Sequence, residues 1–93
     1  MQQLRQYVVK PGQMEPFLEV FRQLRPIRAR HGFRVVGSWT APAENEFVWI
    51  VEHDGDFAAA EEAYYGDPER NAIKPAPGEF LDAVTLRMIE PVS

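Results

Sequence analysis

The residues best suited to chemistry are an asparagine, a tryptophan, a tyrosine and an arginine on segments expected to be neighbouring strands. Asn45 and Trp49 share one segment, while Tyr7 and Arg87 lie near the two ends of the chain. Aromatic rings can wall an apolar pocket, and an indole N–H and a guanidinium can stabilise an enolate or phenolate. In this hypothesis Trp49 donates its N–H and Arg87 holds the developing anion. The structural alternative makes Asn45 a turn residue, Trp49 a core side chain and Arg87 part of a solvated strand edge.

The two histidines are further candidates. We expect His53 to share a face with Trp49, where it could be a general base or a heme ligand because imidazole titrates near neutrality. Its alternative is a partly exposed polar residue at a strand end, beside Asp54. His31 precedes Gly32 and is expected to contact a helix C-terminus. No spacing of ligand residues resembles a metal set, so the sequence predicts no metal site and no cofactor.

Composition limits the class of protein. The chain has 93 residues, 45% of them hydrophobic, which predicts a single globular domain over residues 1–93. It contains no cysteine, which excludes disulfides, zinc ribbons and thiol nucleophiles. No segment approaches the about 18 apolar residues of a membrane span, and the N-terminus shows no apolar signal core. We therefore expect a cytoplasmic protein without a membrane partner.

Charge is distributed unevenly along the chain. Residues 1–40 carry seven basic and two acidic side chains, whereas the remainder is strongly acidic and brings the net charge to −4. The basic residues Arg22, Arg25, Arg28 and Arg30 fall in the last turns of a predicted helix, where cations complement the helix dipole. An acidic chain without a basic, aromatic-interleaved stripe is not expected to bind nucleic acid. The halves of opposite sign could instead meet across a subunit interface.

Hydrophobic spacing and turn residues divide the chain into strands and helices. The predicted strands are residues 4–10, 33–40, 45–53 and 84–89, and the predicted helices are residues 14–31 and 57–65, with a further helical turn from Asp67. This order is the ferredoxin-like β-α-β-β-α-β plan, an α+β fold with helices on one face of an antiparallel four-stranded sheet.

The central hairpin determines which side chains share a face. We expect Thr40 to pair with Glu46 across the loop 41–44. The further pairs are then Arg34–Glu52, Val35–Val51, Val36–Ile50 and Gly37–Trp49. They combine an ion pair, two aliphatic pairs and a glycine that leaves room for an indole.

This register gathers the aromatic side chains on one face. That face carries Phe33, Val35, Gly37, Trp39, Phe47, Trp49, Val51 and His53. The bulky side chains of helix 14–31 favour the smaller, aliphatic face, which leaves the aromatic face uncovered. An uncovered apolar face marks an interface or a ligand site, so two sheets are expected to pack together around a cavity. The alternative places the tryptophans in the core beneath the helices.

Several motifs, in this order, resemble the NIPSNAP family. They are Lys10-Pro11-Gly12, the amphipathic helix with Pro26, His31-Gly32-Phe33, Val36-Gly37-Ser38-Trp39, Asn45-Glu46-Phe47-Val48-Trp49 and Asp67-Pro68-Glu69. Together they span nearly the whole chain. The resemblance implies a dimeric α+β barrel and hence a homodimer. The family pattern continues Asp-Pro-Glu with a tryptophan where this chain has Arg70, so an aromatic contact near the second helix is expected to be missing.

The superfamily implied by this resemblance also includes cofactor-free monooxygenases, heme enzymes, dehydratases and isomerases. The set Asn45, Trp49, Tyr7 and Arg87 is similar to the asparagine, tryptophan, tyrosine and arginine that line cavities in those monooxygenases. Because one fold hosts many chemistries, the resemblance alone does not assign a reaction.

Three functions remain open. The first is binding of a small apolar or aromatic molecule between the sheets of a homodimer, in a cavity formed by Tyr7, Trp39, Phe47, Trp49 and Arg87. The second is a cofactor-independent monooxygenase or isomerase acting there on an aromatic or carbonyl compound. The third is a non-catalytic dimeric interaction scaffold whose cavity is filled by side chains.

Overall fold

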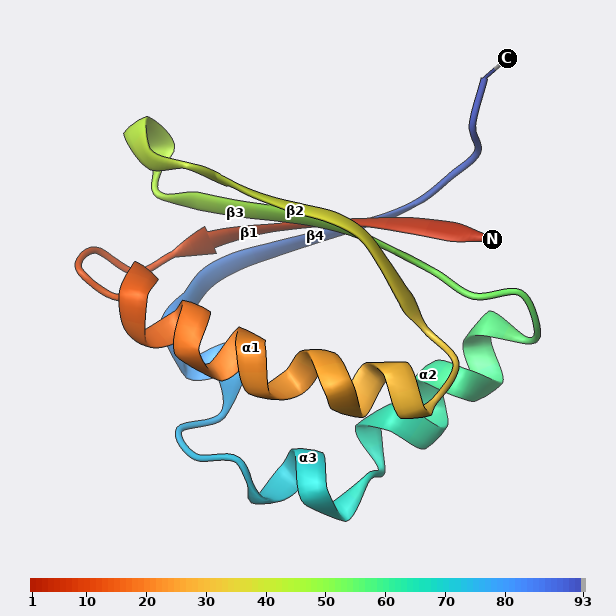
Figure 1. The fold of residues 1–93 in the computed structure, drawn as a ribbon. Coiled ribbons are helices and arrows are strands. Elements are labelled where there is room, and N and C mark those ends of the chain that lie inside the picture. The colour runs from red at the N-terminus through yellow and green to blue at the C-terminus, as the bar shows by residue number, and fades with distance from the viewer. Residues whose placement is uncertain (93) are drawn as a thin grey trace.

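The computed structural model describes residues 1–92 as two layers, a four-stranded sheet and a layer of helices beneath it (Figure 1). The strands are β1 (Gln2–Val9), β2 (Arg34–Ala41), β3 (Glu46–Glu52) and β4 (Leu81–Ile89). The helices are α1 (Met14–Arg30), α2 (Phe57–Tyr65) and α3 (Pro68–Ala72), with 3-10 turns at Pro42–Glu44 and Pro77–Phe80. Within these residues, no helix is both long enough and apolar enough to span a membrane.

The sheet has the order β2-β3-β1-β4, and its paired strands are all antiparallel. This confirms the predicted α+β, ferredoxin-like arrangement of strands and helices. β1 lies between β3 and β4, so a side chain of β1 has neighbours from both ends of the chain. The sheet therefore brings Arg5 opposite Trp49 on one side and opposite Leu86 on the other.

The helix ends follow from local sequence. Asp56 caps α2, where its carboxylate accepts a hydrogen bond from the backbone N–H of Ala59 at 3.0 Å. Asp67 caps α3 in the same way through the N–H groups of Glu69 and Arg70. Gly32 follows α1 with a φ of 87°, a left-handed conformation that glycine adopts without strain.

The central hairpin corrects the predicted register. The pairs Arg34–Glu52 and Val35–Val51 are confirmed, but the pairing then shifts, so that Gly37 lies opposite Ile50 and Trp39 opposite Val48. The extra residue at the shift is Val36. A bulge of this kind moves every residue beyond it to the other face of the strand, because side chains alternate with period two.

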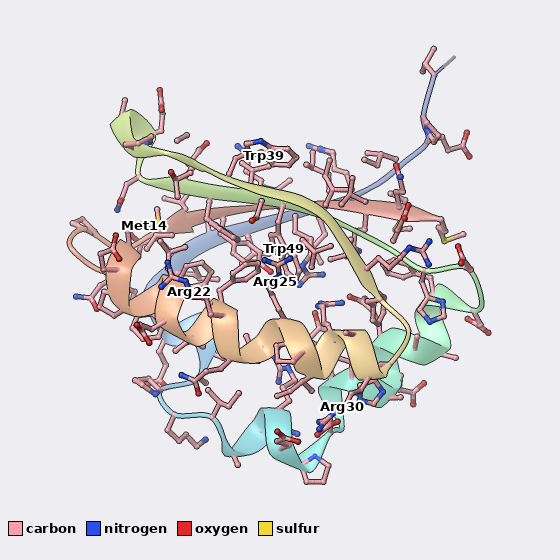
Figure 2. All side chains as sticks on the ribbon, in the orientation of Figure 1. Met14, Arg22, Arg25, Arg30, Trp39 and Trp49 are labelled. Atoms are coloured by element: carbon pink, nitrogen blue, oxygen red, sulfur yellow. The ribbon has the colours of Figure 1, made fainter. Side chains whose placement is uncertain are left out.

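The predicted face assignment is consequently wrong. Phe47 and Trp49 lie between the sheet and α1, with ring centroids 4.7 Å and 5.0 Å from that of Phe21. Trp39 lies on the opposite side of the sheet from the helices (Figure 2). The aromatic side chains of β3 are core, which is the alternative that the sequence left open. The glycine that makes room for an indole is Gly37, as expected, but the indole is that of Trp39.

The uncovered face of the sheet carries an apolar patch with one large aromatic side chain, beside polar residues that include Gln6, Glu46 and Arg87. Trp39 is 54% exposed and Val36 is 51% exposed. Leu4 pairs with Ile50 and Arg87 on this face, where both leucine and isoleucine are half-buried. On the helix-facing side, the edge strand β4 also leaves apolar side chains exposed, namely Val84, Leu86 and Met88. The helices therefore cover β1 and β3 and leave the edge strand open.

Candidate functional site

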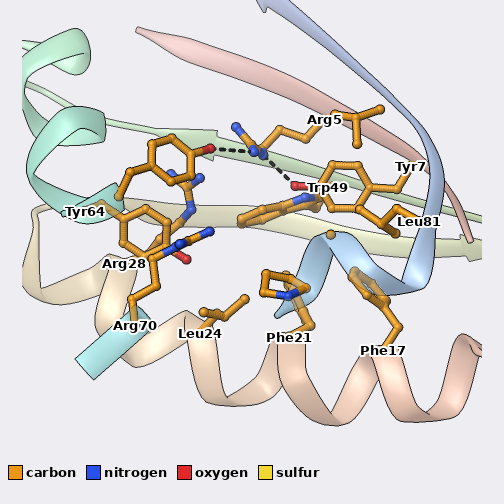
Figure 3. Close-up of a pocket in the computed structure, with 14 residues that line it drawn as sticks. Arg5, Tyr7, Phe17, Phe21, Leu24, Arg28, Trp49, Tyr64, Arg70 and Leu81 are labelled. Atoms are coloured by element: carbon orange, nitrogen blue, oxygen red, sulfur yellow. Dashed lines mark hydrogen bonds between the residues drawn. The ribbon is translucent and has the colours of Figure 1, made fainter. Parts of the chain in front are cut away.

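A cavity of about 180 Å³ lies between the inner face of the sheet and the helices (Figure 3). The sheet contributes Arg5, Tyr7 and Trp49 to its lining, α1 contributes Phe21, Leu24 and Arg28, and α2 and α3 contribute Tyr64, Tyr65 and Arg70. The exposed residues Tyr65, Gly78 and Val84 also line it. The mouth therefore lies between the end of α2, the 3-10 turn Pro77–Phe80 and β4, and the fully buried residues form the inner end.

The walls of the cavity are aromatic. Tyr7 and Trp49 meet edge to face, with ring centroids 6.4 Å apart, and Trp49 meets Phe21 in the same manner at 5.0 Å. These T-shaped arrangements are the ones that aromatic quadrupoles favour. Trp49 is 4% exposed, and its Nε1 is buried without a hydrogen-bond partner among residues 1–92. The cavity thus combines apolar walls with a free N–H donor.

Arg5 forms the centre of a hydrogen-bond network at one side of the cavity. Its Nε donates to the Tyr7 hydroxyl at 2.8 Å, and its Nη2 donates to the Tyr65 hydroxyl at 2.9 Å. Its Nη1 donates to Gln3 at 2.7 Å and to Glu61 at 3.1 Å. Burial acts to lower the pKa of Arg5, but the two tyrosines outweigh it and the pKa is raised. Arg5 is a charged and well-partnered group that orients Tyr7 and Tyr65.

Arg28 is buried more deeply and has fewer partners. It is 2% exposed, and its guanidinium carbon lies 4.3 Å from the ring centroid of Tyr64, 4.8 Å from that of Phe33 and 5.1 Å from that of Trp49. Its Nη2 contacts Glu61 at 3.4 Å, while its Nε and Nη1 have no partner in the described chain. Aromatic faces stabilise a cation, but they leave these two N–H donors unsatisfied.

Arg70 approaches the same cavity from α3. Its guanidinium carbon lies 5.1 Å from the ring centroid of Tyr64 and 4.8 Å from that of Tyr65, so Tyr64 contacts both Arg28 and Arg70. Burial raises the pKa of the Tyr64 phenol, which therefore stays neutral between the two cations. Figure 3 shows the guanidinium of Arg70 extending from the tyrosine toward the middle of the cavity.

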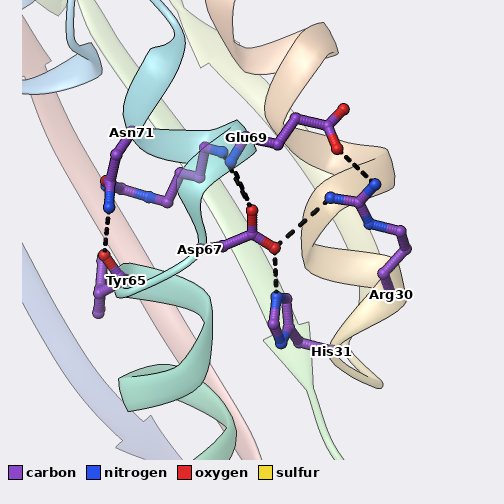
Figure 4. Close-up of polar contacts among 7 residues, drawn as sticks. Arg30, His31, Tyr65, Asp67, Glu69 and Asn71 are labelled. Carbon is purple, nitrogen blue, oxygen red and sulfur yellow. Dashed lines mark hydrogen bonds and ion pairs between the residues drawn. The ribbon is translucent and has the colours of Figure 1, made fainter.

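A polar clasp positions α3, and with it Arg70, against the end of α1 (Figure 4). His31 Nε2 lies 2.7 Å from Asp67 Oδ2, and Arg30 pairs with both Asp67 and Glu69. Asn71 completes the contact by donating to the backbone carbonyl of Tyr65 at 3.0 Å. The hydrogen bond to His31 is the largest of the interactions that lower the pKa of Asp67. The clasp keeps the start of α3 in place beside the cavity.

The cavity holds an excess of positive charge. Arg5, Arg28 and Arg70 all line it, and Glu61 is the carboxylate that pairs with two of them, at 3.1 Å and 3.4 Å through a single oxygen. Arg70 forms no ion pair within residues 1–92, and its Nη1 donates to the neutral side chain of Asn71. Three guanidinium groups therefore line a mostly apolar cavity, and a single nearby carboxylate balances only part of their charge.

Two of the predicted site residues lie in this cavity. Tyr7 and Trp49 line it, and Phe47 lies directly behind it in the core, with its ring centroid 5.1 Å from that of Phe17. These residues do come together, but under the helices rather than on the uncovered face. Trp39 and Arg87 lie on the opposite side of the sheet, so the predicted five-residue set does not share one face.

The side chains of Asn45 and His53 hold loops in place. Asn45 has a left-handed φ of 55°, and its amide donates to the carbonyl of Val9, which fixes the hairpin loop to β1. His53 Nδ1 accepts the N–H of Gly55 at 2.9 Å, and its Nε2 lies 3.0 Å from the carbonyl of His31. Because a carbonyl can only accept, Nε2 is the donor of this hydrogen bond. Neither side chain lines the cavity.

Sequence reasoning missed Arg5, Arg28 and Arg70 as site residues. Arg28 does lie in the last turn of α1, as expected of a helix-end cation, but it also belongs to the buried apolar face that includes Phe21 and Leu24. The spacing 21, 24, 28 was the available signal, because it puts an arginine in phase with core residues. Arg5 gave a similar signal on β1, where it alternates in phase with Tyr7 and Val9.

Metal binding finds no support in the described chain, where no group of three or more His, Cys, Asp or Glu side chains is placed to hold an ion. Asp54 forms a two-bond ion pair with Arg34, at 2.9 Å for each bond. That pair lowers the pKa of Asp54. Acidic groups near the sheet edge are therefore engaged with arginine.

Comparison with solved structures agrees with the resemblance drawn from the sequence. An uncharacterized NIPSNAP domain protein from Burkholderia xenovorans aligns with a TM-score of 0.85 and 23% identity, over 99% of this chain and 94% of the other. A NIPSNAP family protein of unknown function from Agrobacterium tumefaciens aligns with a TM-score of 0.86 and 21% identity, over 97% and 86%. A putative antibiotic biosynthesis monooxygenase from Bacteroides thetaiotaomicron aligns with a TM-score of 0.78 and 15% identity, over 100% and 90%.

Neither a protein-family model nor a curated protein matches the sequence at a significant level. At identities of 15–23%, the structural matches establish the fold that this chain shares with NIPSNAP proteins and with the monooxygenase. The function has to be argued from the cavity itself.

Proposed function

We propose that this protein binds a small molecule with an aromatic or apolar body, in the cavity between the sheet and the helices of each subunit. The observation that carries the proposal is the lining of the cavity, in which aromatic walls surround Trp49 Nε1, a buried donor without a partner in the described chain. Ligand sites characteristically combine apolar walls with a few polar groups that fix orientation.

The size of the cavity indicates the size of the ligand. An apolar cavity of about 150 Å³ accommodates benzene, and this cavity of about 180 Å³ is partly open at its mouth. The proposed ligand therefore has about one ring enclosed by the aromatic walls, and any larger part projects toward the mouth at β4 and the 3-10 turn.

Native mass spectrometry of the purified protein, compared with its denatured mass, tests the proposal. We expect a subunit with added mass, and the control is the variant Leu24→Trp, in which a larger side chain fills the cavity. Loss of the added mass in this variant supports binding in the cavity. Added mass that persists unchanged in Leu24→Trp contradicts it, as does ligand-free protein that also fails to bind single-ring compounds.

We further propose that the protein is a homodimer whose subunits meet through the uncovered faces of their sheets. An exposed tryptophan beside Val36, Leu4 and Ile50 forms an apolar patch of the kind that marks an interface. The substitution Trp39→Glu is expected to give a monomer by light scattering, with the fold retained. A wild-type monomer would contradict the dimer, and with it the interaction-scaffold function.

A cofactor-independent oxidation or isomerisation in the same cavity is the second candidate function. It is favoured by Trp49 Nε1 and the Arg28 guanidinium, which can stabilise an enolate or phenolate formed from a bound carbonyl or aromatic compound. The solved structure described as a putative antibiotic biosynthesis monooxygenase adds support by fold alone. Oxygen consumption with phenolic substrates tests this function. A catalytic indole predicts that Trp49→Phe loses turnover while substrate binding changes little.

A further inference from the structure

We infer that the ligand of this cavity carries a planar oxyanion, a carboxylate or an enolate, on its aromatic or apolar body. The inference rests on the proposed binding function and adds the chemical class of the ligand. The structure assigns the anionic group to the side of the cavity where Arg28, Arg70 and Trp49 present buried N–H donors.

The first support is the charge balance around the cavity. Arg5 and Arg28 share a single oxygen of Glu61, and Arg70 has no acidic partner in the described chain. Arg28 is buried and shares its one carboxylate with Arg5, and Arg70 is half-buried without one, so part of their hydration is lost and is not replaced by an acidic partner. An anion bound in the cavity would supply that missing charge.

The second support is the set of unsatisfied donors. Among the described residues, the buried side-chain nitrogens without a partner are Nε and Nη1 of Arg28, Nε1 of Trp49 and Nε of Arg70. Each of these side chains lines the same cavity. A carboxylate accepts up to about four hydrogen bonds and donates none, so it matches a site that offers only donors.

Arg5 has a different role, although it lines the same cavity. Its Nε, Nη1 and Nη2 donate to Tyr7, Gln3, Glu61 and Tyr65 at 2.7–3.1 Å, so its hydrogen bonds are largely made within the protein. Arg5 is therefore a structural cation that holds neighbouring side chains, whereas Arg28 has free donors that can bind a ligand. The anion is therefore expected beside Arg28, and the hydrophobic part of the ligand beside Phe21 and Leu24.

A matched pair of probes tests the inference. Benzoate and benzamide have nearly the same shape. Benzoate is an anion that only accepts hydrogen bonds, whereas benzamide is neutral and its NH₂ group donates them. We expect benzoate to bind at least tenfold more tightly than benzamide, measured by titration of backbone and indole resonances, because hydrogen bonds to charged groups are stronger than neutral ones.

Variants locate the charge that makes the difference. Arg70→Gln is expected to reduce the preference for benzoate over benzamide by about fivefold or more. Arg22→Gln removes an exposed arginine that does not line the cavity, and it should leave the preference as it is. Arg28→Met is expected to reduce the preference for benzoate further, because Arg28 is the more deeply buried cation. If Arg28→Met does not fold, Arg70→Gln still tests the inference.

The outcomes separate the two proposals. Equal binding of benzoate and benzamide in the cavity overturns the anion inference and leaves the proposed binding function standing. Failure of both probes, and of neutral single-ring compounds, overturns both. Preferential benzoate binding that Arg70→Gln and Arg28→Met leave unchanged also overturns the inference, because the charge would then act from elsewhere.

Discussion

The guanidinium of Arg28 lies 5.1 Å from the ring centroid of Trp49, and nitrogen atoms of both side chains are buried without a partner in the described chain. One residue comes from α1 and the other from β3, so their contact depends on the packing of the helix against the sheet. Their two functional groups, a cation and an indole N–H, line the same cavity. This pair is the centre of the proposed site.

Glu61 is expected to be important for stability because it is the acid that faces both Arg5 and Arg28. Glu61→Gln leaves two buried guanidinium groups without a counterion, and we expect the free energy of unfolding to fall by about 2–3 kcal/mol. Arg28→Met in the Glu61→Gln background should recover at least half of that loss, since an apolar side chain of similar length replaces an unpaired cation. Chemical denaturation of the two single variants and the double variant measures this. Additive losses in the double variant would show that the two residues do not interact.

The clasp at Asp67 predicts a dependence of stability on pH. Its hydrogen bond to His31, its backbone contacts and Arg30 lower the pKa of Asp67 in the folded protein. A carboxyl group with a lowered folded pKa contributes stability above its unfolded value, near pH 4, and the contribution is lost as the pH falls through the folded value.

The matched substitution for this prediction is Asp67→Asn, because asparagine still caps α3 but cannot form the ion pair. Asp67→Asn should be less stable than the wild type at pH 7, and the difference should shrink as the pH falls below about 4. Thermal unfolding between pH 2 and 7 measures both curves. Asp82→Asn, at an exposed position of β4, is the control and should follow the wild-type curve. If the difference in stability between the wild type and Asp67→Asn stayed constant with pH, this account of the clasp would be refuted.

Gly37 is expected to control the position of Trp39 on the uncovered face. A Cβ at Gly37 would lie 2.5 Å from Cη2 of Trp39, so the indole has to move in Gly37→Ala. Because Trp39 is largely exposed, the movement should cost less than about 1 kcal/mol of subunit stability. The proposed dimer should weaken by at least tenfold, measured by analytical ultracentrifugation. An unchanged dimer with a displaced indole would place the interface elsewhere.

The fold could be predicted from the sequence because its signals are local and mutually consistent. The turn at Pro11-Gly12, the apolar spacing of α1 and the caps Asp56 and Asp67 each determine one element, and the element order then restricts the topology. Two of the hairpin pairs were predictable for the same reason. The shift at Val36 was not predicted, although Gly37 beside it was an available signal, because a glycine inside a strand often marks a bulge.

That single bulge explains why the site was only partly predictable. It turns Trp39 outward while Trp49 stays inward, so a prediction based on strict alternation put both on one face. The arginines were missed for another reason. Charged residues are expected at the surface, so the in-phase spacing of Arg5 and Arg28 with core residues was not interpreted as burial. The three-dimensional packing places both among aromatic rings.

The two tryptophans lie on opposite faces of the sheet, and their indole N–H resonances therefore distinguish the two places where a ligand could bind. The measurement is a proton–nitrogen correlation spectrum during titration with benzoate, in which Trp39→Phe assigns the two indole signals. We predict that the Trp49 signal shifts on binding and that the Trp39 signal does not. A shift confined to Trp39 would place the ligand between the sheets of two subunits and contradict the cavity beneath the helices as the site.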